Sequence, residues 1–516
     1  MRVGLSSLVV VFAPMAAGPA FAENLTDALR AANASNPTLE AARSDTKAIA
    51  QDVAIARGAF LPNIVFGGTI NRNVNENAGV NTQIGVPIPI ESTVRTRSFG
   101  LDASLNQDIF TSGRNLGQLG QAKARARAAL ANLVGVEQQV ALQVVTAYVD
   151  VRRDLEALRI SVNNQEVLVQ RLEEARQRFA VGDVTRTDVA QAEASLAGAR
   201  AAVATAQANL DASRAIYREV VGAAPGELEA PPDVAAVLPG SLEAALATAE
   251  DLSPTITRAE YNLRGAKHAV TVARSGYLPQ LGVTGQINRF NTDGDAIISQ
   301  FDGNGDFIGS VRNPSDSLRR GTTVAGRLTV PLYDGGIARA QTRAAKAQAT
   351  SAKARLEETR RDVFQQAAAA WANYQASQSV IVSSREQVQA NLLALEGVEQ
   401  EQKVGLRTTI DVLIAQQTLL DSQLALVNAE RNAYVAAHTL LAVIGVLNAQ
   451  TLGLADQGAY SPAAQGEPQE GGGAEQANLA SQQTFKLSAL SRGARLYVTR
   501  TTGQRVYGPF LDSRSG

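Results

Sequence analysis

"SNPTLEAARSDTKAIAQDVAIARGAFLPNI" (Ser35–Ile64) decides the fold, because it returns 217 positions later as "LSPTITRAEYNLRGAKHAVTVARSGYLPQL" (Leu252–Leu281). Each copy has a proline near its start and a Leu-Pro pair near its end. A second pair of matching stretches follows at an offset of 223, "LNQDIFTSGRNLGQ" (Leu105–Gln118) and "LTVPLYDGGIARAQ" (Leu328–Gln341). A repeat of this length predicts two copies of one structural plan. We assign the first copy to residues 23–239 and the second to residues 240–455.

The N-terminus predicts export. Arg2 precedes an apolar run from Val3 to about Ala17, and Ala20-Phe21-Ala22 is a small-x-small cleavage site, which together are typical of a secretory signal peptide at residues 1–22. The apolar run is too short to span a bilayer comfortably, and no later run reaches the roughly 18 uninterrupted apolar residues of a transmembrane helix. An exported chain of this kind is expected to be either soluble or a β-barrel.

Composition argues against most catalytic sites. The 516 residues contain no cysteine and only two histidines, His268 and His438, so disulfides and thiolate metal sites are excluded and imidazole chemistry has little material. The net charge of -1 gives no general attraction to nucleic acid. We therefore expect no enzyme activity, no catalytic residues, no metal and no cofactor.

Each half contains two segments in which apolar residues alternate, and these predict β-strands. The four segments begin after a proline-terminated helix and are "NIVFGGTINRNV", "SFGLDASLNQDIF", "QLGVTGQINRF" and "TVAGRLTVPLY". Alternation over about 10 residues suits a tilted transmembrane strand, although a soluble hairpin with one buried face gives the same pattern. The intervening stretches, about Asn75–Thr96 and Asn291–Arg320, are polar and are predicted to be long loops.

Very long helices follow the strands in both halves. The sequence predicts helices at about Arg114–Phe179 and Ile337–Lys403, and at 1.5 Å per residue each would be about 100 Å long. Several apolar positions are eleven residues apart and would keep an apolar stripe nearly straight along the first helix; the positions are Val140, Ala147, Val151, Leu158, Val162 and Val169. Return helices of about 35 residues are expected at Asp188 to about Val221 and Asp411 to about Val446.

The turns between these helices repeat a short motif. "VGDVTRTDV" (Val181–Val189) and "VGLRTTIDV" (Val404–Val412) both place Asp three residues after a Thr. One interpretation is a capping box that begins the return helix. The other follows from symmetry, because four strands cannot close a barrel and several chains would have to share one. Asp188 and Asp411 would then form rings of carboxylates around an opening that favours cations.

Taken together, these motifs resemble the TolC-like outer-membrane factors of efflux and type I secretion. The resemblance covers about Glu23 to Ala455 and rests on "ENLTDALRAANASNPTLEAARSD", the "LPNI" and "LPQL" motifs, "VPLYDGG", "RFAVGDVTRTDV" and "VGLRTTIDV". It implies a mainly α protein with a β-barrel part, in which three chains share one twelve-stranded outer-membrane barrel continued by a long α-helical barrel. The implied partners are outer-membrane lipid, a periplasmic adaptor and an inner-membrane pump.

The resemblance also suggests residues of a gate at the periplasmic end. By position, Asp411 would line the constriction, and Thr187, Asp188 and Arg407 would link neighbouring helix pairs. Two positions differ from TolC, which has a second constriction Asp where this chain has Ile414 and a linking Tyr where it has Gln402. A single Asp ring should bind cations less tightly. The turn glycines, Gly182 and Gly405, mark the expected adaptor contact.

Two other functions are compatible with parts of the sequence. An exported structural or adhesive coiled coil would explain the signal peptide, the repeat and the long helices, but not four alternating segments at matched places. An exported enzyme could use "NTDGDAIISQFDGNGD" (Asn291–Asp306) as a calcium loop, but the glycine and terminal Glu of an EF-hand are misplaced. Residues 456–516 are linker-like, match neither half, and are predicted to be a flexible tail.

Overall fold

The computed structural model describes residues 23–81, 88–302, 304 and 306–447. The predicted signal peptide and the predicted tail lie outside the described residues. All of the described residues belong to one compact unit.

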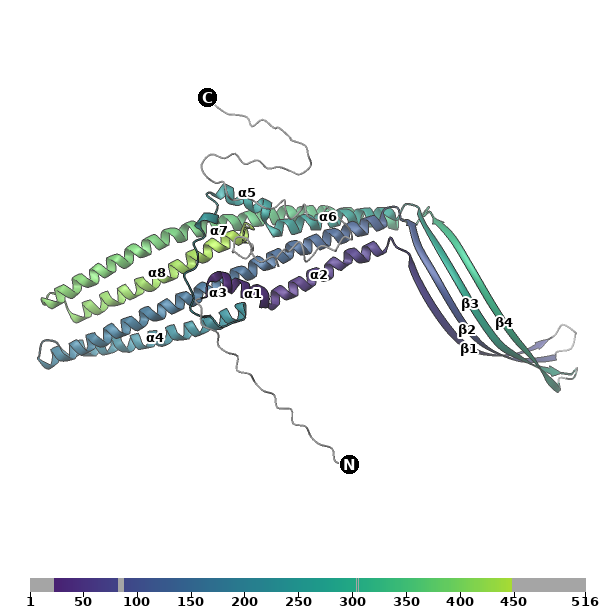
Figure 1. Cartoon of the computed structure of the whole chain (residues 1–516), viewed down its shortest axis with the longest axis horizontal. Coiled ribbons are helices and arrows are strands. Elements are labelled where there is room, and N and C mark those ends of the chain that lie inside the picture. Colours follow the sequence, from purple (N-terminus) through teal and green to yellow (C-terminus); the bar gives the residue numbers. More distant parts are fainter. Residues whose placement is uncertain (1–22, 82–87, 303, 305, 448–516) are drawn as a thin grey trace, which may run out of the picture. The chain divides into compact units, whose positions relative to one another are not determined.

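The chain passes twice through the same order of elements (Figure 1). The first half contains α1 (Leu25–Ser35), α2 (Pro37–Gly58), β1 (Asn63–Asn81), β2 (Ile88–Phe110), α3 (Arg114–Ala180) and α4 (Arg186–Val221). The second contains α5 (Leu242–Leu252), α6 (Pro254–Ser275), β3 (Gln280–Phe301), β4 (Phe307–Thr329), α7 (Ile337–Lys403) and α8 (Thr409–Val443). One turn of 3-10 helix, η1 (Ala235–Val237), lies between them. The sequence repeat therefore corresponds to a repeat of structure.

The helices lie close to their predicted positions. α3 extends one residue beyond the predicted end, α7 has the predicted bounds, and both are 67 residues long. The return helices α4 and α8 have 36 and 35 residues. Proline occupies the first turn of α2 and α6, where its missing N–H removes no helical hydrogen bond.

The four strands form one antiparallel sheet in the order β1-β2-β3-β4. They have 19 to 23 residues, about twice the predicted length, and the predicted loops are largely strand. The prediction was wrong because apolar alternation was taken to mark the whole strand. Beyond the alternating part both faces carry polar residues, as in "NENAGVN" at the end of β1, while backbone pairing continues to Asn81.

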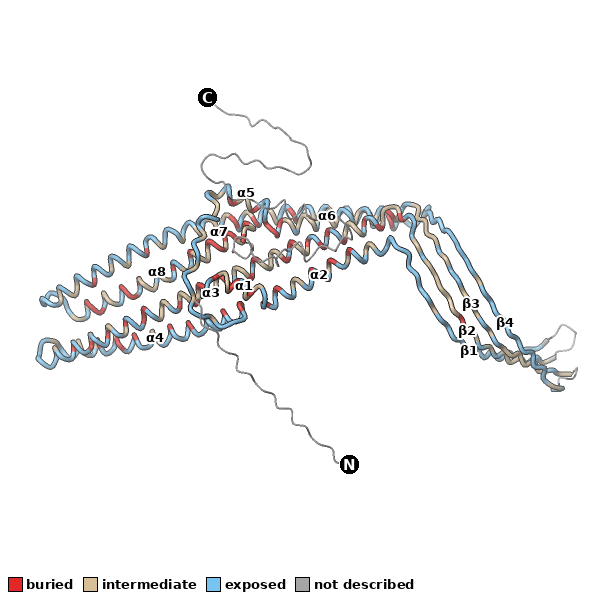
Figure 2. Tube along the Cα trace, viewed as in Figure 1, coloured by how far each residue is buried: buried red, intermediate tan, exposed pale blue. Residues whose placement is uncertain are grey.

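One face of the sheet is apolar and exposed. Side chains two residues apart on a strand share a face, and cross-strand register places Ile70, Phe99, Ile287 and Val324 on the same face. These four side chains are 48–77% exposed. Figure 2 shows the strands mostly as exposed or intermediate and the buried residues mainly in the helices. The outer edges of β1 and β4 pair with no other strand among the described residues.

Each half has its own helical core. One cluster of buried side chains is drawn from residues between Leu25 and Val221, and another from residues between Ala245 and Leu447. Only α3 contains a stretch that is apolar enough to cross a membrane by length and composition, among the helices described. α3 includes fully buried side chains such as Val144 and Tyr148, and we interpret it as a core helix.

The predicted apolar stripe of α3 is only partly buried. Val140, Ala147 and Val151 are buried, but Val162 and Val169 are 38% and 45% exposed. Toward the turn the buried positions of α3 are instead Ile160, Ser161, Asn164, Leu168, Leu172 and Ala175. These include pairs eleven residues apart, Ser161 with Leu172 and Asn164 with Ala175, but they are not the predicted positions. Two partly exposed valines, Val162 and Val169, therefore remain on one face of α3.

Glu23, the first described residue, forms hydrogen bonds with residues near the end of the first half. Its N–H donates to the carbonyl of Glu227 (2.7 Å), and its carbonyl accepts from the N–H of Glu229 (3.1 Å). The Tyr148 hydroxyl lies 2.9 Å from the Glu23 carbonyl oxygen, and the Tyr217 hydroxyl donates to Glu23 Oε1 (2.6 Å). Both tyrosine side chains are fully buried, so this connection is part of the first core.

Candidate functional site

The two turns between long and return helices have the same backbone structure. In the first, Gly182 has φ 82°, its N–H donates to Phe179 O (3.0 Å), and the N–H of Asp183 donates to Arg178 O (2.9 Å). In the second, Gly405 has φ 80° and both bonds recur. This pair of hydrogen bonds is the Schellman motif, which ends a helix at a residue in the left-handed conformation, usually glycine. The conformation of the turn therefore accounts for both glycines.

A capping box begins each return helix. The backbone N–H and the hydroxyl of Thr185 both donate to Asp188 Oδ2 (2.8 and 2.7 Å), and the N–H of Asp188 returns a bond to the Thr185 hydroxyl (3.3 Å). Thr408 makes the corresponding bonds to Asp411 Oδ2 (2.9 and 2.7 Å). The helix-start interpretation of the repeated Thr and Asp is thus confirmed. These contacts do not test the aperture interpretation.

These hydrogen bonds keep both carboxyl groups ionised. The Thr185 hydroxyl, followed by its backbone N–H, lowers the pKa of Asp188. The backbone N–H of Thr408, followed by its hydroxyl, lowers the pKa of Asp411, and the nearby charge of Arg407 lowers it further. Hydrogen bonds to the charged form favour that form. Both side chains are therefore fixed negative charges at neutral pH.

Each turn also contains one ion pair, and the two pairs have opposite polarity. Arg178 at the end of α3 pairs with Asp183 in the turn (2.6 Å). Glu401 at the end of α7, the repeat equivalent of Arg178, pairs with Arg407 in the turn (2.7 Å). The Glu401 carboxylate is the main cause of the raised pKa of Arg407. The two turns thus have the same backbone conformation, but the charge at the end of the long helix is reversed and its partner in the turn is one position later in the second turn.

The predicted gate residues do not all meet within one chain. Arg407, Asp411 and Gln402 belong to the second turn, where Gln402 Nε2 donates to Thr409 Oγ1 (3.4 Å). Thr187 and Asp188 belong to the first. Among the described residues, the hydrogen bonds and ion pairs of these five side chains remain within their own helix pair.

Contacts between the two helix pairs involve residues that the sequence did not single out. Arg171 of α3 forms an ion pair with Glu399 of α7. Gln416 of α8 donates to the buried Asn164 of α3 (3.0 Å), and Leu413 packs into a cluster of α3 and α4 side chains. The one available signal was Asn164, a polar residue at a position where the helix period predicts burial.

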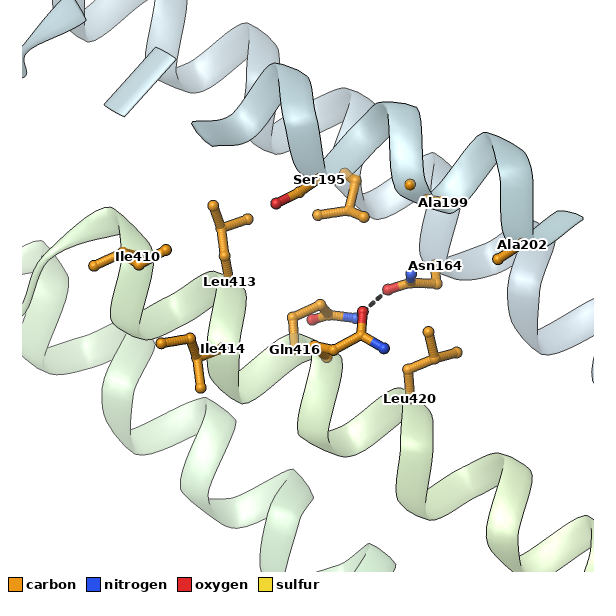
Figure 3. A pocket seen from close by; sticks show the side chains of 12 residues that line it. Asn164, Ser195, Ala199, Ala202, Ile410, Leu413, Ile414, Gln416 and Leu420 are labelled. Carbon is orange, nitrogen blue, oxygen red and sulfur yellow. Dashed lines mark hydrogen bonds between the residues drawn. The ribbon is translucent and has the colours of Figure 1, made fainter. Parts of the chain in front are cut away.

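A groove separates α8 from α4 just beyond the turns. Its volume is about 390 Å³. Its walls include Asn164, Ser195 and Ala199 on one side and Leu413, Ile414 and Gln416 on the other (Figure 3). The hydrogen bond between Gln416 and Asn164 crosses from one side to the other. Ile414 is 58% exposed, so it contributes an apolar surface near the turn.

The other candidate chemistries find little support among the described residues. The proposed calcium loop is mainly strand, because Asn291–Phe301 belongs to β3. Asp302 follows the strand and accepts the N–H groups of Asn304 and Asp306 (both 2.9 Å), which is a turn. No group of three His, Asp or Glu side chains in the described ranges is arranged to hold a metal. His438 is buried, and its desolvation lowers its pKa.

Comparison with known proteins identifies related sequences over most of the chain. Residues 28–223 and 245–446 match the profile of the outer membrane efflux protein family. The chain is 32% identical over 435 residues to the outer membrane efflux protein BepC of Brucella suis, covering 84% of this chain and 88% of that protein. It is 26% identical over 436 residues to the outer membrane protein TolC of Escherichia coli, covering 84% of each.

Solved structures share the fold at low sequence identity. The CmeC outer membrane channel of Campylobacter jejuni superposes with a TM-score of 0.65 at 16% identity, covering 82% of this chain and 85% of that one. The outer membrane protein VceC of Vibrio cholerae gives a TM-score of 0.63 at 20% identity, covering 82% and 96%. These likenesses show that the four strands and the paired long helices belong to a known architecture.

Proposed function

This chain belongs to the outer membrane efflux protein family, and we propose that three copies of it close into a single conduit. It is an outer-membrane channel of the efflux and type I secretion class, a passive duct that extends into the periplasm. Its relative BepC is named as an efflux protein and its structural neighbour CmeC as a channel, and we infer that this chain performs no covalent chemistry. The alternative, an exported structural or adhesive coiled coil, does not explain the four-stranded sheet.

The sheet supports the trimer. Four strands are too few to close a barrel, and both β1 and β4 have one edge without a partner in the described chain. Backbone groups at an open edge cannot be left unpaired in lipid. Three sheets joined edge to edge would give twelve strands and no free edge. The exposed valines on α3, Val162 and Val169, suggest that helices of another copy cover that face.

The turns support a gate at the periplasmic end. α3 and α7 begin next to the sheet and end at the turns, so the turns lie about 100 Å from the strands by the helical rise. Three copies would place three Asp411 carboxylates and three Arg407–Glu401 ion pairs around the far opening. We propose that Asp411 lines this opening and that Arg407, Thr187, Asp188 and Gln402 link neighbouring helix pairs.

The turns also support contact with partner proteins. Val181, Val404 and Leu406 are 71–80% exposed, and they flank Gly182 and Gly405. Apolar side chains clustered on an exposed surface are typical of protein interaction sites. We propose that a periplasmic adaptor binds here and couples the channel to an inner-membrane pump.

Assembly can be tested on the purified mature chain in detergent. We expect a heat-resistant trimer by gel electrophoresis and light scattering, and discrete conductance steps in a planar bilayer. A mature chain that is monomeric and soluble without detergent would exclude the proposal.

A photo-crosslinking residue at Val404 tests the partner. It should capture an adaptor in cells, whereas the same residue at Val380, an exposed position in the middle of α7 (52%), should not. Equal capture at both positions would contradict adaptor binding at the turn. The pump that copurifies would distinguish small-molecule efflux from protein secretion.

A further inference from the structure

Arginine is the only cationic residue in the four strands, and most of these arginines lie on the apolar face of the sheet. The strands contain eight arginines and no lysine. By strand alternation and register, six of the eight lie on the face of Ile70 and Ile287, and two lie on the polar face. The six are Arg72, Arg95, Arg97, Arg289, Arg312 and Arg320, and the two are Arg319 and Arg327.

Four of the six form two directly opposed pairs. Arg72 of β1 faces Arg97 of β2, and Arg289 of β3 faces Arg320 of β4. The internal repeat relates the two pairs, because the offset of 217 takes Arg72 to Arg289 and the offset of 223 takes Arg97 to Arg320. The same arrangement therefore occurs once in each half of the chain.

Like charges directly opposite each other on one face destabilise a sheet. Neither pair has a protein partner to offset this, since none of the four side chains makes a hydrogen bond or ion pair within the described residues. All four are exposed. Arg312 differs, because it forms an ion pair with Asp295 on the neighbouring strand. The repeated Arg–Arg pair thus has a cost to stability that an anion bound between the two guanidinium groups would remove.

The pairs lie at the boundary of the apolar surface. Toward the helices, the same face continues with Ile70, Phe99, Ile287 and Val324, all exposed. Toward the hairpin loops, it carries acidic residues, including Glu91, Asp293, Asp295 and Asp316, interspersed with apolar ones such as Val74 and Leu318. In a bilayer this boundary is the level of the lipid headgroups, where long cationic side chains place their charge.

We propose that each Arg–Arg pair binds a phosphate group of a phosphorylated lipid in the outer leaflet, which gives six such sites in the trimer. The inference rests on the proposed function, because the orientation of the barrel puts the hairpin loops outside. A guanidinium group offers a planar fork of donors that fits phosphate oxygens, and lysine lacks this fork. Location on the apolar face excludes cargo in the channel as the ligand.

The pair Arg289 and Arg320 gives the cleaner test. Asp293 is opposite Arg97 across β2 and β3, so an internal ion pair could compete at the first site. Arg289 has Leu101 as its other cross-strand neighbour, and Arg320 is on the edge strand, so it has no second cross-strand neighbour within the described chain. Substitution of both by Gln removes the site. The matched control is Arg319→Gln with Arg327→Gln, which removes two arginines from the polar face of the same sheet.

The experiment uses the full-length mature trimer in neutral detergent, titrated with bis-phosphorylated lipid A and followed by native mass spectrometry. Dephosphorylated lipid A serves as the comparison lipid. The parent and control trimers should bind the phosphorylated lipid preferentially, and Arg289→Gln with Arg320→Gln should weaken that binding by about tenfold or more, the scale of a lost charge-assisted bond. Arg289→Lys with Arg320→Lys should give an intermediate loss.

A stability measurement separates binding from a general structural role. In detergent without phosphorylated lipid, Arg320→Gln should leave the temperature of trimer dissociation unchanged or raise it, because a like-charge pair is removed. With lipid A present, the same variant should dissociate at a lower temperature than the parent. A variant that is less stable in both conditions would overturn the proposal.

Other results would also overturn it. These are unchanged binding by the Gln or Lys variants, an equal loss in the control, or equal binding of dephosphorylated lipid A. Failure of the parent chain to form a trimer or to conduct ions would instead overturn the proposed function, so the two failures are distinguishable.

Discussion

Gly445, just after α8, should be the least replaceable turn glycine in the helical part of the chain. It has φ 83°, and a Cβ atom added there would lie 2.3 Å from the carbonyl oxygen of Leu252 and 2.6 Å from its carbonyl carbon. Leu252 ends α5 next to Pro254, the first residue of α6. Gly445→Ala must therefore move the backbone that joins two helices, because no flexible side chain can give way.

Two other glycines allow the cost of left-handed backbone strain to be separated from the cost of the steric clash. Gly182 has φ 82° with nothing within 4 Å of an added Cβ, so Ala there incurs only the left-handed strain, about 1 kcal/mol. Gly222, the repeat equivalent of Gly445, has φ 87° and would meet the Ser35 hydroxyl at 2.6 Å. That hydroxyl can rotate away, but it would lose its bond to Val221 O, which adds about 1 kcal/mol.

For Gly445→Ala we add about 1 to 3 kcal/mol of forced displacement to the strain, which gives a loss of about 2 to 4 kcal/mol in the free energy of unfolding. The expected order of destabilisation is Gly445, Gly222, Gly182. Asn sharpens the comparison because it tolerates the left-handed conformation. Gly182→Asn should be nearly neutral, whereas Gly445→Asn should remain strongly destabilised by the clash.

Guanidinium unfolding of the detergent-solubilised protein measures this series. The single tryptophan, Trp371, packs against the core of the second half, so its fluorescence reports the region around Gly445. Circular dichroism at 222 nm reports total helix in all variants. If Gly445→Ala unfolds at the same denaturant concentration as Gly182→Ala, the reasoning from backbone contact is wrong.

Four further predictions concern the turns and the tail. Asp411→Asn should weaken block of the channel current by trivalent cations added from the periplasmic side. The control Asp188→Asn, which alters the same type of cap, should affect this block less. An unchanged block in Asp411→Asn refutes the aperture role. Arg407→Ser should raise single-channel conductance, and an equal rise in Glu401→Gln would assign the effect to their ion pair. Because the pKa values of Asp188 and Asp411 are lowered in the folded protein, capping should stabilise the turns above about pH 4. This stabilisation should be lost as pH falls through the folded-state pKa, which an acid titration followed by circular dichroism of the helices checks. Truncation after residue 455 should leave trimer assembly intact, as gel electrophoresis would show.

The helices were predictable because their signals are local. Gly at the end of α3, Thr and Asp at the start of α4 and the proline at the start of α2 act within one turn of the helix, and the repeat supplies each signal twice. The ends of the strands were not predictable, because backbone pairing continues where side-chain alternation stops.

Contacts between elements that are distant in the sequence could not be predicted either. Arg171 and Glu399 are two among many charges on long helices, and nothing local marks them as partners. Arg72 and Arg97 occur on separate strands, and only the register makes them neighbours. The turns that contain the candidate gate residues were thus predictable from the sequence, while the contacts that connect one helix pair to the other required the structure.

The Glu23 connection has a consequence for the order of events during export. All of its contacts are made by residues up to Glu229, and the first core uses side chains up to Val221. In a chain that leaves the inner membrane N-terminus first, these contacts and the buried side chains of the first core are therefore available before the second half, which adds Tyr434 and Val435 to the same core. Once closed, the first half offers α3 as a ready surface on which α6 and α8 dock as they arrive. The duplicated plan thus divides the buried side chains between two cores that follow each other along the chain, so the residues of the first core leave the inner membrane before those of the second.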